Sequence, residues 1–109
     1  NKAFLLGHVG HTPKLSQTRS GQQATRVSLG TSQTIYRADG TKEQRTEWHN
    51  VVAYGRLAEN VCAYVQKGNL LWVEGEMHMR EYVTRDGIQK QLTEVIANNV
   101  QFFRNEPVR

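Results

Sequence analysis

Apolar and polar side chains alternate along most of this chain, a spacing that is typical of β-strands with one buried face. Within residues 26–34, for example, Val27 and Leu29 fall on one face and polar side chains fall on the other. Similar alternation, or a short apolar run, recurs in four more segments. The pattern therefore predicts five strands, at residues 2–9, 26–34, 46–54, 70–82 and 91–103.

One segment has helical spacing instead. Leu57, Val61 and either Tyr64 or Val65 recur every three or four residues, which predicts a helix of about ten residues between the third and fourth strands. Gly68 follows this segment and is expected to cap the C-terminus of the helix.

Glycines mark the expected bends and turns. Gly7 and Gly75 interrupt two strands, as happens where a small barrel turns a corner. Asp39-Gly40 and Arg85-Asp86-Gly87 are turn signals, because glycine tolerates a positive φ, and they predict two long polar hairpins. The first hairpin would carry the residues between Tyr36 and Thr46 on a protruding arm.

Three strands, a helix and two further strands are the element order of the OB-fold, a common oligonucleotide binder. We therefore predict an all-β chain with one short helix: a five-stranded Greek-key barrel with its helix between strands 3 and 4. The sequence contains no internal repeat or low-complexity tract, and we expect one domain over residues 1–105.

Composition narrows the possible partners. The chain has 109 residues with 14 Lys and Arg against 10 Asp and Glu, a net charge of +4 that suits a small domain meeting a polyanion. Its single cysteine, Cys62, permits no intrachain disulfide, so we expect a reducing, cytoplasmic compartment. Because no apolar run approaches the roughly 18 residues of a membrane span, we expect no membrane partner.

The segment 46–57 carries the clearest functional signal. Strand alternation places Trp48 and Tyr54 on one face, and Arg56 follows two residues after Tyr54. A protein that binds any single strand needs flat rings for base stacking and cations for phosphates, because base-edge hydrogen bonds would impose a sequence preference. Both are present here, so we predict that Trp48, Tyr54 and the neighbouring Arg56 form a platform that binds single-stranded nucleic acid.

Basic side chains next to the aromatic residues or on the hairpins are expected to contact phosphates. This first group consists of Lys2, Arg37, Lys42, Arg56, Arg80 and Arg85. A second group consists of Arg26, Arg45, Lys67 and Lys90. Since a lone surface cation is usually solvated, the hypothesis depends on the cluster as a whole.

Several strings, taken in order and spacing, resemble the bacterial-type single-stranded DNA-binding proteins, and the resemblance covers nearly the entire chain. They are residues 1–10, 46–49, 64–68 and 73–75. The resemblance implies an OB-fold subunit, usually a homotetramer, that coats single-stranded DNA during replication, recombination and repair without catalysis. It implies a bacterial, nucleoid-associated protein in the cytoplasm, although mitochondrial members share the pattern.

The resemblance also assigns stacking residues. Trp48, Tyr54 and Tyr82 match positions of base-stacking aromatics, and many relatives carry phenylalanine and tryptophan where this chain has the two tyrosines. A further stacking aromatic is usual near the end of the second strand. Either Ile35 or Tyr36 lies opposite it, and we favour Tyr36.

The fourth predicted strand has two different faces. Its apolar face, expected inside the barrel, carries Leu71, Val73, Met77 and Met79. The other face carries Trp72, Arg80 and Tyr82. We expect Trp72 to form a subunit contact rather than a DNA contact, since Glu74 and Glu76 on the same face would repel phosphate.

Histidines and the cysteine raise the question of a metal site: His8, His11, His49, His78 and Cys62. No pair has the close spacing with flanking cysteines that structural zinc sites use, so we expect neither a metal nor another cofactor. His49 faces away from Trp48 and is expected to be buried or paired at a subunit contact. Cys62 is expected to pack within the helix.

Other functions stay open at this stage. A primosomal OB-fold protein, acting in replication restart, would generally lack the full set of stacking aromatics. A barrel that binds a peptide would have no salt-dependent affinity for DNA. An enzyme would need convergent carboxylates or a nucleophile beside a base, whereas Glu47 and His49 merely share a strand face, so we expect no catalytic residue.

Family members normally continue past the barrel into a flexible Gly/Pro/Gln-rich tail, whose acidic tip recruits replication and repair enzymes. Residues 106–109 would be the start of such a tail, absent or truncated here. Replication and repair proteins are therefore expected partners only if the full-length protein has the tail.

Overall fold

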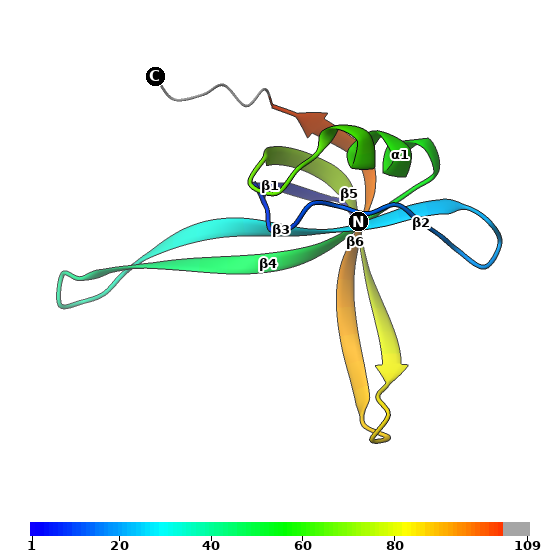
Figure 1. Cartoon of the computed structure of the whole chain (residues 1–109). Coiled ribbons are helices and arrows are strands. Elements are labelled where there is room, and N and C mark those ends of the chain that lie inside the picture. Colours follow the sequence, from blue (N-terminus) through cyan, green and yellow to red (C-terminus); the bar gives the residue numbers. More distant parts are fainter. Residues whose placement is uncertain (104–109) are drawn as a thin grey trace.

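The computed structural model describes residues 1–103, in which strands and one helix build a barrel with long hairpins (Figure 1). The elements are β1 (Ala3–Val9), β2 (Ser16–Gln17), β3 (Gln23–Tyr36), β4 (Lys42–Tyr54), α1 (Gly55–Tyr64), β5 (Leu70–Val83) and β6 (Gln89–Phe102). The predicted boundary at residue 105 and the tail at 106–109 lie outside the described residues.

The strands close into a barrel in the order β1-β5-β6-β4-β3, and β2 adds a short edge to β3. Closure comes from an antiparallel pairing of β1 with β3, in which His8 lies opposite Gly30 and Val9 opposite Leu29. The pairing of β4 with β6 is parallel and the other pairings are antiparallel. The predicted fold class is confirmed: an OB-fold whose helix follows the third barrel strand.

Two close backbone approaches explain the glycines at the predicted bends. A Cβ added to Gly7 would lie 2.3 Å from the carbonyl oxygen of Gly30, so β1 and β3 could not pair as they do. A Cβ added to Gly75 would lie 2.2 Å from the carbonyl oxygen of Ile96, at the register shift between β5 and β6. Only a residue without a side chain fits at these points.

Alternation along the strands builds the core, because every second side chain points into the barrel. Leu29, Val51 and Val73 are almost fully buried, and α1 covers one end of the barrel by packing against β3, β4 and β6. The buried apolar cluster comprises Val9, Val27, Leu29, Val51, Ala53, Ala58, Val61, Val65, Leu71, Val73, Val95, Ala97 and Val100.

The two predicted hairpins are present, and they leave the barrel in different directions (Figure 1). The first joins β3 to β4, whose pairing continues as far as Tyr36 and Lys42, so both strands run further than the sequence predicted. The second joins β5 to β6. Their turns place Gly40 at φ 87° and Gly87 at φ 79°, as the turn signals required.

Three details of the prediction were wrong. The helix ends at Tyr64, before Gly68, because Val65 becomes extended and inserts its side chain into the core. Met77 and Met79 are on the predicted face but are 50% and 69% exposed, since β5 leaves the barrel after Gly75 and that face no longer meets a core. The two-residue strand β2 was missed because it has no apolar residue.

No helix within residues 1–103 is long and apolar enough to cross a membrane.

Candidate nucleic-acid interface

The register of β3 against β4 gathers aromatic side chains on one outer face. Residues directly opposite each other in an antiparallel pair point to the same side. Trp48 lies opposite Gly30, and Tyr54 lies opposite Ala24. The two residues are six positions apart along β4, so about 20 Å of strand lies between them. Trp48 is 59% exposed and Tyr54 is 39% exposed, which leaves both rings accessible.

The same register distinguishes the two residues considered for the further stacking position. Tyr36 pairs with Lys42 on the face that carries Trp48, and its ring is well exposed. Ile35 pairs with Glu43 on the opposite face. Geometry thus favours Tyr36, whose contact with DNA stays a prediction.

The ring of Trp48 lies against two glycines. An added Cβ on Gly10 would be 2.6 Å from Cζ3 of Trp48, and one on Gly30 would be 2.9 Å from the same atom. The backbone of these glycines therefore supports the six-membered part of the indole. Sequence reasoning missed both residues, because glycine has no side chain and leaves no signal of what packs on it.

The outer face continues onto the second hairpin through β6. Asn50 pairs in parallel with Glu94, and Glu94 pairs with His78 of β5. Even-numbered residues of β5 therefore share this face, which includes Arg80 and Tyr82. Tyr82 is 44% exposed and lies directly opposite Lys90, so a cationic side chain is next to this ring as well.

The structure divides the predicted phosphate-binding residues into two groups. Lys2 lies 3.8 Å from Glu74, Arg37 pairs with Glu43, and Arg80 pairs with Glu94. Within residues 1–103, no ion pair involves the other members of the first group, which are the exposed Lys42, Arg56 and Arg85. In the second group, Arg26 and Arg45 are paired, with Glu94 and Glu43 respectively.

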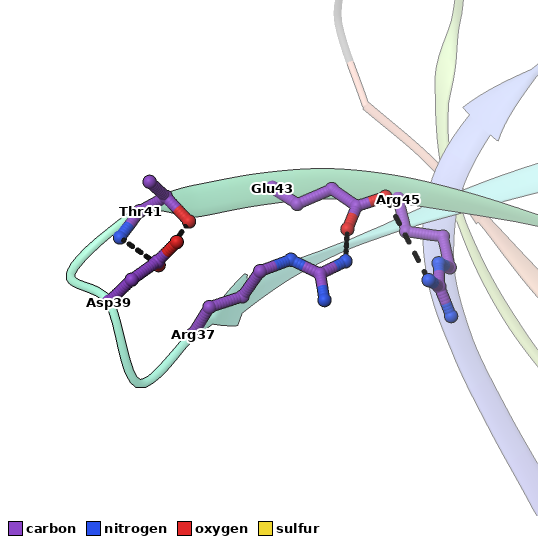
Figure 2. Close-up of polar contacts among 5 residues, drawn as sticks. All are labelled: Arg37, Asp39, Thr41, Glu43 and Arg45. Atoms are coloured by element: carbon purple, nitrogen blue, oxygen red, sulfur yellow. Dashed lines mark hydrogen bonds and ion pairs between the residues drawn. The ribbon is translucent and has the colours of Figure 1, made fainter.

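Polar contacts order the tip of the first hairpin, as Figure 2 shows. Glu43 lies between Arg37 and Arg45, and the Arg45 contact measures 3.8 Å. At the turn, Asp39 accepts hydrogen bonds from the Thr41 hydroxyl at 2.7 Å and from the Thr41 backbone N–H at 3.0 Å. These two hydrogen bonds hold the pKa of Asp39 below its usual value, and the bond from the hydroxyl has the larger effect.

A buried carboxylate lies within the outer face and was not anticipated from the sequence. The side chain of Glu94 is 7% exposed, and its Oε2 lies 2.6 Å from Nη1 of Arg26 and 3.4 Å from Nη2 of Arg80. The two arginines belong to different strands, β3 and β5. Only the register of β6 between β4 and β5 brings the three residues together.

A shallow groove adjoins the platform and contains a basic residue that sequence reasoning missed. Its lining residues are His11, Thr12, Lys14, Ser16 and Arg26. Arg26 also lines a neighbouring pocket that includes Tyr54, so the groove leads toward that ring. Lys14 lies in the segment before β2, where no periodic pattern indicated which way its side chain would point.

Trp72 is on the outer face of β5, as predicted, in an apolar patch with Phe4 and Leu6. Its ring centroid lies 5.8 Å from that of Phe4, and Leu6 lies opposite it in the pairing of β1 with β5. Phe4 and Leu6 are 57% and 54% exposed. His49 is half-buried and hydrogen-bonds through Nε2 to the Thr31 hydroxyl at 2.9 Å. The roles of Trp72 and His49 in subunit contacts stay predictions.

In the part of the chain that the structure describes, no three His, Cys, Asp or Glu side chains lie close enough together to hold a metal ion.

The chain is similar to known proteins over nearly all of its length. The model of the single-strand binding protein family matches residues 1–103. A single-stranded DNA-binding protein of Xanthomonas axonopodis pv. citri is 41% identical over 103 residues, which are 94% of this chain and 57% of that protein. One from Neisseria meningitidis serogroup A is 35% identical over 108 residues, 97% of this chain and 62% of that protein.

A solved structure of the Plasmodium falciparum SSB complex with ssDNA superposes with a TM-score of 0.87 and 28% sequence identity, covering 95% of both chains. The chain spans about three fifths of the length of the curated relatives. The match over residues 1–103 and the identity to these relatives show that the chain belongs to the single-strand binding protein family.

Proposed function

We propose that this protein binds single-stranded DNA without sequence preference and protects it during replication, recombination and repair. The observation that carries the proposal is the shared outer face of Trp48, Tyr54 and Tyr36, with exposed cations beside it. Stacking on each ring contributes about 1–3 kcal/mol per base and does not depend on base identity. Tyr82 on the second hairpin would extend the path of the strand.

Basic side chains would hold the backbone between the rings. Lys42 lies on the Trp48 face, directly opposite Tyr36, and Arg56 follows Tyr54 at the start of α1. Arg85 lies at the tip of the second hairpin. Arg37, Arg80 and Lys2 would contact phosphate while keeping their carboxylate partners. We also infer a bacterial cytoplasmic location, and recruitment of replication and repair proteins where the full-length protein has a C-terminal tail.

A titration with oligo-dT tests this function. Binding should quench the fluorescence of Trp48, and Trp48→Ala should weaken binding by about 1–3 kcal/mol. The second tryptophan, Trp72, serves as the internal control. Its ring packs on Phe4, so its fluorescence, measured in Trp48→Ala, should be quenched little by oligo-dT. Tighter binding of duplex DNA than of oligo-dT would refute the proposed function. An unchanged affinity in Trp48→Ala would refute the role of Trp48 in stacking.

We further propose a homotetramer built from symmetric dimers. The exposed patch of Phe4, Leu6 and Trp72 supports it, since contiguous apolar surface of this kind commonly marks an interface. A second surface fits the same role: an apolar pocket lined by residues that include Ala3, Leu5 and Met77, next to His49. Several subunits would let one strand cross several platforms and raise affinity through effective concentration.

A further inference from the structure

Among the charged residues within residues 1–103, Glu94 alone is buried. Burying a carboxylate is costly unless cations and hydrogen bonds compensate it. Here the compensation comes from Arg26 and Arg80, which reach one oxygen, Oε2, from opposite sides of β6. The position is unexpected for a face proposed to meet phosphates, because a negative charge there would repel them.

The two arginines remain accessible although they are paired. Their side chains are 48% and 57% exposed, so the guanidinium groups border solvent while the carboxylate beneath them does not. Each guanidinium carries five N–H donors, and Glu94 contacts one nitrogen of each. The two guanidinium groups therefore have N–H donors that Glu94 does not contact, and the three charges of the cluster sum to +1. It also adjoins Tyr54, since Arg26 and Tyr54 line one pocket.

We propose that Glu94 is a positioning residue that holds Arg26 and Arg80 as one preformed binding site for a phosphate of the single-stranded DNA backbone. The site rests on the proposed function. Arginine loses less freedom per hydrogen bond when its planar fork is already oriented, and a fixed carboxylate provides that orientation. Two guanidinium groups held at one point would then meet the phosphate without first having to be ordered.

The substitution Glu94→Gln separates positioning from net charge. Simple electrostatics predicts tighter binding, because a negative charge leaves the face. The positioning role predicts binding to oligo-dT about tenfold weaker, and a log–log salt dependence shallower by about 0.7 for one lost phosphate contact. The matched control is Glu76→Gln, which removes the same charge from the same face, where the carboxylate contacts His78 rather than an arginine. This control should bind at least as tightly as the wild type.

Two further measurements test whether Glu94 acts through the arginines. In an Arg26→Ala, Arg80→Ala background, Glu94→Gln should cause no additional weakening; a further tenfold loss would mean that Glu94 acts through the fold and would overturn the site. Replacing both arginines with lysine keeps the charge and removes the forks. Weaker binding by the lysine variant supports the site even if Glu94→Gln fails to fold, and wild-type affinity overturns it.

Different results would overturn the proposed function and the phosphate site. A wild-type protein that does not bind oligo-dT would overturn the proposed function. A wild type that binds, together with a Glu94→Gln variant that binds as tightly as Glu76→Gln, would overturn only the phosphate site.

Discussion

Alanine at Gly10 should weaken DNA binding without unfolding the protein. The added Cβ would lie 2.6, 3.1 and 3.3 Å from three carbons of the Trp48 ring. Ordinary contact between carbons requires about 3.5–4.0 Å, so the ring must move outward by about 1 Å. Trp48 is 59% exposed, which gives it room to do so. Gly10 has no positive φ, so alanine is compatible with the backbone.

The expected loss follows from the displaced ring. A misfit of about 1 Å between the displaced ring and its base forfeits up to half of a van der Waals contact, and one stacked base contributes about 1–3 kcal/mol. Gly10→Ala should therefore weaken oligo-dT binding by about 0.5–1.5 kcal/mol, or roughly two- to tenfold. The free energy of unfolding should change by less than about 1 kcal/mol, since alanine also restricts the unfolded chain.

Equilibrium titration with oligo-dT and urea unfolding measure the two quantities, and two variants control for other causes. In a Trp48→Ala background, Gly10→Ala should have no effect on affinity. Gly7→Ala, whose Cβ would meet a backbone carbonyl oxygen at 2.3 Å, should instead lower stability by about 1–3 kcal/mol or more. The reasoning is refuted if Gly10→Ala retains wild-type affinity while Trp48→Ala loses it.

Three other predictions concern charge, assembly and the hairpin turn. Changing Lys42 and Arg56 together to alanine should make the salt dependence of oligo-dT binding shallower by about 1.4 on a log–log plot, and a parallel line at lower affinity would mean that these residues act through the fold. Trp72→Glu should lower the oligomeric state measured by sedimentation equilibrium, because it adds an unpaired charge to the apolar patch; a wild-type monomer at micromolar concentration would refute the assembly. The pKa of Asp39, measured by NMR, should lie below 3.8 and rise toward that value in Thr41→Val. Because the folded pKa is lowered, the stabilisation from this turn should be present above the unfolded pKa and lost as the pH falls through the folded one, and an unchanged pKa in Thr41→Val would contradict the assigned cause.

Local patterns were sufficient for the elements and for the main rings. Alternation around Val27 and Leu29 predicted a strand with one buried face, and the Asp39-Gly40 signal predicted the hairpin that follows it. Trp48 and Tyr54 could be assigned to one face because a strand preserves parity over six residues. These inferences depend only on residues that are close together in the sequence.

Features that depend on register were out of reach. Glu94 lies 68 residues from Arg26, and only the parallel pairing of β4 with β6 brings the two together. The support of Trp48 by Gly10 and Gly30 depends on the closure of β1 against β3. The exposure of Met77 was missed for a related reason, because periodicity shows which face a residue is on but does not show where the barrel ends.

The position of β6 has a consequence for synthesis of the protein on the ribosome. Within residues 1–103, the strand that emerges last is β6, which lies between β5 and β4, so neither of these two can be fully paired before β6 has been made. Until residues 89–102 are available, the nascent chain exposes one unpaired edge of β4 and one of β5, the kind of edge that pairs with other chains. A stop codon or a protease cut before β6 should therefore leave an open sheet that aggregates, instead of a smaller folded domain.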